Sequence, residues 1–390
     1  MSANRMLISK ANWPEADHRL LLQILLRDDR EASQNAWTTW IDNHDLDDID
    51  PASFFVLPQL FLKLKSIIGD CSSLDRIRGV YRQTWLRNQL YLQGLFQVVE
   101  LFESHQIPCV TMKGMNTLLF CYRDLGARVM YDFDVLVPER NFEKSVAVLR
   151  EHAWTEARNK IPPAELRRYW HAWGFKSPIG QFVDLHYRAA SVDTSKDFDS
   201  QIIGRSVVRQ YQGKNLRVPE PTDCLLLVCL HARKRDPQSA CRWLLDLSAI
   251  LSTDEIDWNQ LLQRANQSNI LLPVREALTF ASQEFGLPVP DSFLQEAWKI
   301  KATRRQIQKY NRLTRMPLRG NPIKKQWWRY QSGCRSCDER AGLLGFGIFL
   351  STFCKWRFGL KSRWQLPLFL ATELRQSPDP IAHKPVVRKC

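Results

Sequence analysis

The sequence lacks both a long apolar run and an export signal. Its apolar stretch "AGLLGFGIFLSTF", Ala341–Phe353, would rise about 20 Å as a helix, which is short of the roughly 30 Å hydrocarbon core of a bilayer. No charged segment followed by an apolar one and a small-residue cleavage site opens the chain. We therefore expect that this stretch does not span a membrane. We also expect a cytoplasmic protein, with a peripheral position at a membrane left open.

The sequence also lacks the cysteine spacing of a zinc or redox site. Its ten cysteines are spread through apolar segments. The lone CxxC, Cys334 and Cys337, has neither a second pair nor a His-x-His partner, so we expect two ordinary thiols. With 390 residues the chain can form two domains, or three small ones, and bury a substantial core without disulfides.

Acidic residues are scarce in one segment, residues 301–365. This segment has 16 Lys or Arg but only two acids, Asp338 and Glu339, whereas the other 325 residues carry 39 of each sign. The net charge of +14 therefore belongs to this segment alone. Two interpretations stay open: an interfacial helix held at anionic lipid by flanking Lys, Arg and Trp, or a basic surface for RNA. A solvated basic flank beside a buried helix is the structural alternative.

The hydrophobic periodicity of the rest of the chain changes twice. It is helical at first, then alternates as strands do between short helices, and becomes helical again. The predicted fold class is α+β, with a small mixed β-sheet flanked by helices. The predicted regions are an N-terminal helical region (1–105), a sheet-containing core (106–220), a helical half (221–300) and a basic aromatic-rich C-terminal segment (301–390).

Several short segments of the core are predicted strands. "IPCVTMKG", Ile107–Gly114, is a β-rich run followed by a glycine turn and a helix. "VMYDFDVLV" is a second strand, and Pro138 ends it. "GFKSPI" and "QFVDLHY" form a hairpin through Ile179 and Gly180, and "SVVRQYQGKNLRVPEP" forms another that turns at Gly213.

Two carboxylates share one face of the second predicted strand. Because side chains alternate along a strand, Asp132 and Asp134 point away from the apolar face of Tyr131, Phe133, Val135 and Val137. Like charges about 7 Å apart repel unless a cation lies between them. In the later strand Asp184 occupies the corresponding polar face. If the two strands are neighbours, the three carboxylates form a cluster suited to Mg²⁺ or Mn²⁺.

The turn at Lys113–Gly114 offers a contact for phosphate. It closes the first strand and opens a helix, so the N–H groups after Gly114 would face a triphosphate at a helix N-terminus. Lys113 would add a point charge.

Together these motifs resemble a known family. The run "VTMKGMNTLLFCYRDLGARVMYDFDVLVPERNFEKSVAVLREHAW", followed by "VDLHYR", is similar to the nucleotidyltransferase fold superfamily. More narrowly, it resembles the bacterial family of uncharacterised nucleotidyltransferases with a Lys-Gly turn, an Arg ahead of an Asp-x-Asp strand and a later Asp-x-His strand. The strong part of the likeness covers roughly 80 residues and weakens toward Pro290.

The resemblance implies an enzyme that binds NTP through two Mg²⁺ (or Mn²⁺) ions and transfers a nucleoside monophosphate, releasing pyrophosphate. It implies that Asp132 and Asp134 are ligands of both metals, and that Asp184 holds the catalytic metal and positions or deprotonates the acceptor hydroxyl. Lys113, Gly114 and Arg128 would bind the nucleotide. Where the superfamily usually has Gly followed by Ser, this sequence has Met115 and Asn116 after Gly114. An ion pair of Arg128 with Asp124 is the alternative to phosphate contact.

Three functions stay open at this point. The chain could modify a small molecule, a peptide or a sugar-linked metabolite. It could act on tRNA or another RNA, in the manner of a toxin, or it could be a non-catalytic scaffold for a membrane or a partner. His186 fits a packed neighbour better than a base. His231, Arg242 and Asp246 could line an acceptor pocket, although Arg242 and Asp246 could also pair on one helix face.

Overall fold

The structure, a computed structural model, describes residues 14–69, 74–157, 161–190, 194–232, 240–314, 322–336, 341–358 and residue 365. Its helices are α1 (Ala16–Leu26), α2 (Arg30–Ile41), α3 (Pro51–Ile68), α4 (Asp75–Ser104), α5 (Lys113–Thr117), α6 (Phe142–Glu151), α7 (Ala164–Arg167), α8 (Phe198–Arg205), α9 (Pro221–Ala232), α10 (Arg242–Thr253), α11 (Trp258–Gln267), α12 (Leu271–Phe285), α13 (Asp291–Lys299), α14 (Arg304–Thr314), α15 (Pro322–Ser336) and α16 (Leu343–Phe358). Its strands are β1 (Val110–Met112), β2 (Phe133–Leu136), β3 (Thr155–Glu156), β4 (Ala172–Lys176), β5 (Phe182–His186), β6 (Val207–Tyr211) and β7 (Lys214–Val218).

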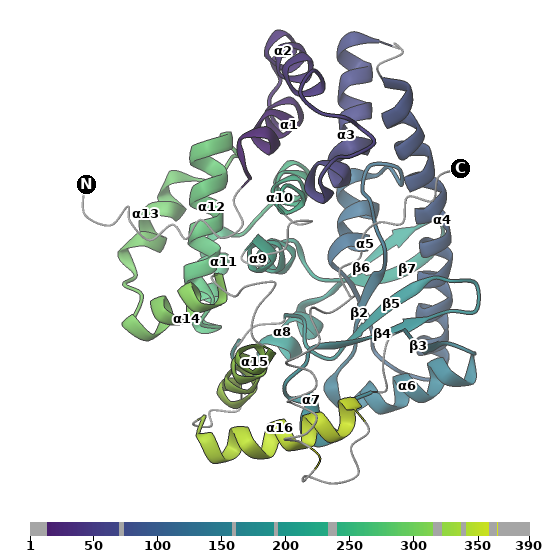
Figure 1. The fold of residues 1–390 in the computed structure, drawn as a ribbon, viewed down its shortest axis with the longest axis vertical. Helices are drawn as coiled ribbons and strands as arrows, with labels where there is room; N and C mark the ends of the chain where they lie inside the picture. The colour runs from purple at the N-terminus through teal and green to yellow at the C-terminus, as the bar shows by residue number, and fades with distance from the viewer. Residues whose placement is uncertain are drawn as a thin grey trace. The chain divides into compact units, whose positions relative to one another are not determined.

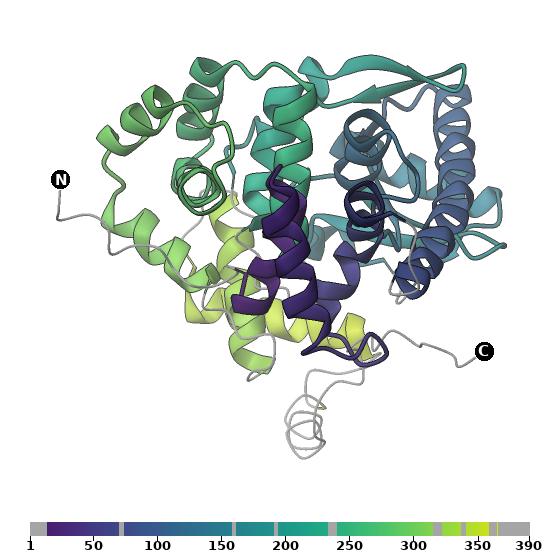
Figure 2. The ribbon, with the colours of Figure 1, turned by 90° about the horizontal axis from the view of Figure 1, so that it is seen from above.

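The chain divides into two compact units. The first comprises residues 1–160 and 171–316, and the second comprises residues 161–170 and 317–390. In the first unit, the sheet and α4 lie on one side of α9 and α10, and the helices α11–α14 lie on the other, as both views show (Figures 1 and 2). This division rests on contacts between residues, whereas the four predicted regions rest on composition and periodicity. The four regions therefore stay a prediction.

A five-stranded mixed sheet forms the centre of the expected core region. Its strand order is β1-β2-β5-β4-β3, in which only the β2–β5 pair is parallel. Buried residues such as Phe133, Val135, Val183 and Leu185 hold these two strands against the helices. The hairpin of β6 and β7 forms a separate two-stranded sheet. The predicted α+β class with a small mixed sheet is therefore confirmed.

Strand β2 is shorter than the sequence predicted. It begins at Phe133, so Asp132 precedes it, and Tyr131 is 40% exposed instead of facing the core. The reason is that α4, and not the sheet, holds the preceding loop. The Asn88 side chain donates to the carbonyl oxygens of Leu125 and Arg128, both at 2.7 Å, and the Tyr91 hydroxyl donates to that of Tyr131 at 2.6 Å.

The other predicted elements agree with the structure to within a few residues. Within the described residues, helices α1–α4 precede the sheet, and helices α9–α13 follow β7. The N-terminus of α3 is fixed by local sequence. The Asp50 carboxylate caps the helix by accepting hydrogen bonds from the N–H groups of Ala52 and Ser53, and Pro51 takes the first helical position. Strand β4 begins at Ala172, two residues before the predicted start, and the short strand β3 was not predicted.

The second unit has its own small core. Leu166 of α7 packs with Tyr330 and Cys334 of α15 and with Phe349 and Phe353 of α16. Aromatic rings predominate there: the Tyr169 ring lies 4.5 Å from that of Phe349, centroid to centroid. Cys334 is a buried free thiol, and Cys337 of the predicted CxxC lies outside the described residues.

Among the described helices, α3 alone is long and apolar enough to cross a membrane by length and composition. More than half of it is buried, and Leu57, Leu60 and Leu64 belong to the core shared with α1. A helix buried in a protein core can be as long and as apolar as a membrane-spanning helix, so length and composition do not distinguish the two. The predicted location of the protein stays a prediction.

Candidate active site

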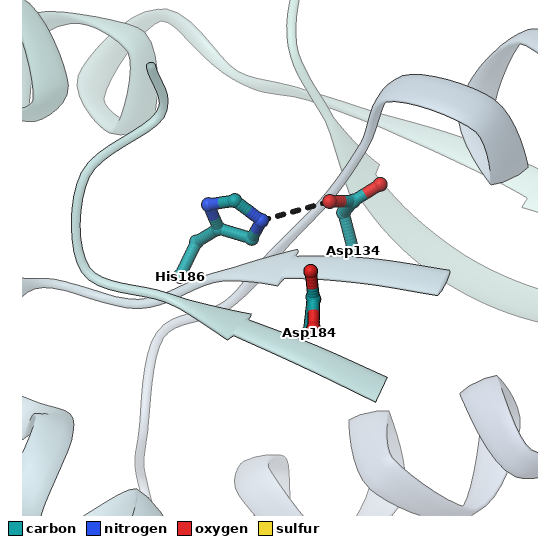
Figure 3. Close-up of side chains that lie close together, drawn as sticks. All are labelled: Asp134, Asp184 and His186. Atoms are coloured by element: carbon teal, nitrogen blue, oxygen red, sulfur yellow. Dashed lines mark hydrogen bonds and ion pairs between the residues drawn. The ribbon is translucent and has the colours of Figure 1, made fainter. Parts of the chain in front are cut away.

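The register of two neighbouring strands brings two of the predicted carboxylates together. Asp134 of β2 is paired directly with Asp184 of β5 in the parallel ladder. One ligand atom each from Asp134, Asp184 and His186 lies within 4.8 Å of the others. Figure 3 shows the Asp134 carboxylate and the His186 ring directed toward each other, with the Asp184 side chain beside them. The cluster predicted from the sequence required these strands to be neighbours, and they are.

The space for the Asp184 carboxylate depends on a glycine of the adjacent strand. Gly174 of β4 is paired with Asp184, and a Cβ added to it would lie 3.1 Å from Asp184 Oδ1. Any larger residue at position 174 would therefore press on the carboxylate.

A cation of the protein already lies against Asp134. The Lys113 ammonium is 2.5 Å from Asp134 Oδ1 and 2.8 Å from His186 Nε2. Burial works to raise the pKa of Asp134, but the positive charge of Lys113 and the hydrogen bond with His186 outweigh it. They hold the pKa of Asp134 well below its usual range. Asp134 is therefore a fully charged carboxylate at neutral pH.

His186 is oriented by its other nitrogen. Its Nδ1 lies 3.0 Å from the carbonyl oxygen of Arg188, which can only accept, so Nδ1 carries a proton. Its Nε2 lies 2.7 Å from Asp134 Oδ1. Ring orientation by a backbone carbonyl is typical of histidines that bind metals. The sequence contained this residue in the Asp-x-His pattern but gave no sign of the contact with Asp134.

Asp132 stands apart from this group. It precedes β2, its side chain is exposed, and it is not one of the three residues whose ligand atoms converge. Although Asp132 keeps surface open to solvent, neighbouring groups crowd its carboxyl and remove part of its hydration. This loss, followed by the charges of Asp134 and Asp184, raises the pKa of Asp132 to about 7. The structure thus places Asp132 within electrostatic reach of the other two carboxylates, and its predicted role as a metal ligand stays a prediction.

Arg128 makes a contact that the sequence did not predict. Its Nε and Nη2 donate to the two carboxylate oxygens of Asp246, both at 2.9 Å, and the Tyr122 hydroxyl donates to Asp246 at 3.1 Å. Burial alone would lower the pKa of Arg128, but the Asp246 carboxylate raises it above its usual value. The alternative of an ion pair with Asp124 is wrong, since Asp124 accepts hydrogen bonds from Tyr81 and from the Gly126 N–H instead.

Gly114 is placed differently from the predicted turn. The residue in the left-handed region is Lys113, with φ 49°, and α5 begins at Lys113 itself. A Cβ on Gly114 would lie 2.3 Å from Nη1 of Arg128. Gly114 is therefore needed for the close approach of the guanidinium and not for a positive φ.

A pocket opens beside these groups. Its empty space, counted together with the part that is open to solvent, is about 480 Å³. The polar and charged residues along it include Lys113, Asn116, Arg128, His231, Arg242 and Asp246. The three residues proposed from the sequence for an acceptor pocket therefore do line one pocket with Lys113. Arg242 also lies over the Phe55 ring, 4.7 Å from its centroid.

The donor set suits a hard divalent cation. Two carboxylates are ligands that Mg²⁺ and Mn²⁺ prefer, whereas the imidazole nitrogen is less typical of Mg²⁺, which binds oxygen. Asp134 Oδ1 and His186 Nε2 face each other, and in this structure the Lys113 ammonium, a positive charge, lies against both atoms. The residues present therefore fit a divalent metal site.

Comparison with known proteins places the chain in a family. Residues 56–286, more than half of the chain, match the family described as uncharacterised nucleotidyltransferase. The chain belongs to this family, and the prediction of an enzyme of the nucleotidyltransferase class is confirmed.

A comparison with solved structures and one with curated proteins do not define the family more closely. An antigenic nucleotidyltransferase-like protein from Paracoccidioides brasiliensis has a solved structure that is 14% identical in sequence, with a TM-score of 0.33. The match covers 58% of this chain and 95% of that one. No curated protein matches the sequence.

Proposed function

We propose that this nucleotidyltransferase uses Mg²⁺ or Mn²⁺ to transfer a nucleoside monophosphate from NTP to an acceptor hydroxyl. The observation that supports this most is the pairing of Asp134 with Asp184 across β2 and β5, at a pocket that contains Lys113. Asp132 would act with them, because the electrostatic effect of both carboxylates reaches it.

In the proposed reaction a bond forms between the acceptor oxygen and the α-phosphorus, and the bond from the α-phosphorus to the bridging oxygen breaks. Pyrophosphate leaves. Asp184 positions the acceptor hydroxyl and takes its proton. A bound divalent ion would neutralise the carboxylates and stabilise negative charge on the phosphates.

The positive residues of the pocket would bind the phosphates. Lys113 can offer its ammonium, and Arg128 keeps Nη1 beside Gly114 while its other two nitrogens bind Asp246. Electrostatic binding and positioning of the phosphates would therefore account for most of the catalysis, and the protein would form no covalent bond with the substrate.

Replacement of Asp184 tests the proposal. We expect Asp184→Asn to lower the rate of transfer by about a thousandfold or more. The reason is that the transition state loses several kcal/mol of stabilisation, which Asp184 provides by holding the metal and positioning the acceptor. Asp184 is a cleaner target than Asp134, because Asp134→Asn would also leave the buried Lys113 ammonium without its carboxylate. The protein, α-³²P-labelled NTPs and a cell extract would be incubated and separated into RNA, protein, lipid and small-molecule fractions.

Asp291→Asn is the matched control, since Asp291 is an exposed carboxylate in the first turn of α13. It should label the same fraction as the unaltered protein. Normal labelling by Asp184→Asn, with the fold intact by circular dichroism, would refute the proposed site. The labelled fraction identifies the acceptor class, which separates an RNA-directed enzyme from one that modifies a small molecule or a peptide.

We further propose that α16 brings the enzyme to an anionic membrane surface. Leu343, Leu344 and Ile348 of α16 are 82%, 83% and 54% exposed. The segment around them carries 16 basic and two acidic residues. Exposed aliphatic side chains within a basic segment favour lipid over RNA, because RNA-binding surfaces use aromatic or guanidinium planes for stacking.

A further inference from the structure

We propose that Lys113 is an internal cation that occupies the metal position in the nucleotide-free protein and leaves it when nucleotide binds. This inference rests on the proposed function, since it concerns the same carboxylates. It adds that metal binding and nucleotide binding are coupled through one side chain.

The first support is the set of three mutual contacts. Lys113 Nζ, Asp134 Oδ1 and His186 Nε2 lie 2.5 to 2.8 Å from one another. The three side chains are 12%, 14% and 0% exposed, respectively. An ammonium buried to this degree is retained only where anions or lone pairs surround it.

The second support is the kind of atom that Lys113 contacts. Its ammonium lies 2.5 Å from Asp134 Oδ1 and 2.8 Å from His186 Nε2. A carboxylate oxygen and an imidazole nitrogen are also ligand atoms for divalent cations, and both residues belong to the cluster whose ligand atoms converge. The ammonium and a metal ion would therefore use the same two atoms.

The two cations therefore exclude one another. A metal ion and an ammonium cannot both contact Asp134 Oδ1 and His186 Nε2 without strong repulsion at short range. Lys113 must move before a metal binds there. It has somewhere to go, because it also lines the pocket in which the phosphates are proposed to bind.

Coupling between the ligands follows. A phosphate in the pocket offers Lys113 a new anionic partner, which frees Asp134 and His186 for the metal. Metal binding would in turn strengthen the binding of phosphate, since coupling of this kind is reciprocal. The protein would then bind metal weakly in the absence of nucleotide.

The test measures Mn²⁺ binding to the full chain without nucleotide, from the electron paramagnetic resonance signal of free Mn²⁺. We expect Lys113→Met to bind Mn²⁺ with a Kd at least about tenfold lower than that of the unaltered protein. Lys113→Arg keeps the charge and should bind as weakly as the unaltered protein. The additional change Asp184→Asn should abolish the gain in Lys113→Met.

Lys176→Met is the matched control, because it removes a charge from β4 of the same sheet, where Lys176 lies over the Phe182 ring. It should not change the Kd for Mn²⁺. If Lys113→Met is less stable, Mn²⁺ should raise its Tm more than that of the unaltered protein. An equal or higher Kd in Lys113→Met, with no added rise in Tm, would overturn the inference.

The two failures can be told apart. If Asp184→Asn abolishes transfer but Lys113→Met binds Mn²⁺ no better, the proposed function stands and the internal cation does not. If Asp184→Asn transfers normally, the proposed function itself is wrong.

Discussion

Single residues of the site are constrained by their neighbours more than by their own backbone. Gly114 has no positive φ, yet a side chain there would meet the Arg128 guanidinium, which Asp246 holds by two hydrogen bonds. A sequence shows that a glycine is present but not which neighbour requires it. The Lys-Gly pattern therefore pointed to a residue that lines the pocket, Lys113, while the reason for the glycine was missed.

Gly114→Ala should destabilise the protein. The added Cβ would lie 2.3 Å from Arg128 Nη1, and the guanidinium cannot shift without loss of its bonds to Asp246. We expect a cost of about 1–3 kcal/mol and a Tm lower by several degrees in a calorimetric scan.

Gly79→Ala provides the contrast, since Gly79 lies inside α4 and a Cβ added to it would have nothing within 4 Å. Alanine there should stabilise the helix by about 0.5–1 kcal/mol. A Gly114→Ala protein at least as stable as Gly79→Ala would contradict the close approach of Arg128.

At the scale of elements, α12 contains a buried acid without a partner. Glu276 is 1% exposed, and neither carboxylate oxygen has a hydrogen-bond partner in the described part of the chain. The neighbouring Arg275 donates to the carbonyl oxygens of Ala297 and Ile300 instead. Burial raises the pKa of Glu276 to about 7, and the charge of Arg275 offsets only part of this effect.

Glu276→Gln should therefore stabilise the protein at high pH. Since the folded pKa lies above the unfolded value of about 4.5, the folded state binds the proton more tightly. The contribution of the Glu276 carboxyl to the free energy of unfolding is therefore fully present below about pH 4.5, and it is lost as the pH rises to about 7. Because glutamine does not ionise, Glu276→Gln keeps this contribution, which is about 3 kcal/mol of the free energy of unfolding.

The measurement is Tm as a function of pH from 5 to 8. The gap between Glu276→Gln and the unaltered protein should widen as the pH rises. The exposed Glu284 of the same helix is the control, and Glu284→Gln should give a gap that does not change with pH. A constant gap for Glu276→Gln would show that Glu276 does not titrate in this range.

The strands were predictable from sequence because their alternation has a strong period of two, but their pairing was not. Asp134 and Asp184 could be assigned to polar faces, whereas the β2–β5 register that joins them is a property of the whole sheet. The start of β2 was placed too early, since the sequence does not show that Asn88 and Tyr91 hold the loop before it. Asp246, 118 residues from Arg128, gave no local signal at all.

At the scale of the whole molecule, the exposed end of α16 should bind lipid. We expect the protein to sediment with vesicles that contain about 30% anionic lipid and to stay in solution with neutral vesicles. Leu343→Glu with Leu344→Glu should reduce this binding by about tenfold or more, because two apolar side chains no longer enter the interface.

The matched control is Leu86→Glu with Leu90→Glu, which changes two leucines of α4 that are 61% and 52% exposed. It should leave vesicle binding unchanged. Absence of vesicle binding by the unaltered protein, together with salt-sensitive RNA binding that survives the α16 change, would assign the segment to RNA instead.

The contact between Arg128 and Asp246 also determines how the chain can be divided. The guanidinium comes from the loop before β2, and the carboxylate comes from α10, beyond both sheets in the sequence. A fragment that stopped after β7 would keep every residue of the candidate metal site but would leave an arginine buried without its anion. Isolated catalytic fragments of this enzyme should therefore be insoluble or inactive unless they extend through α10.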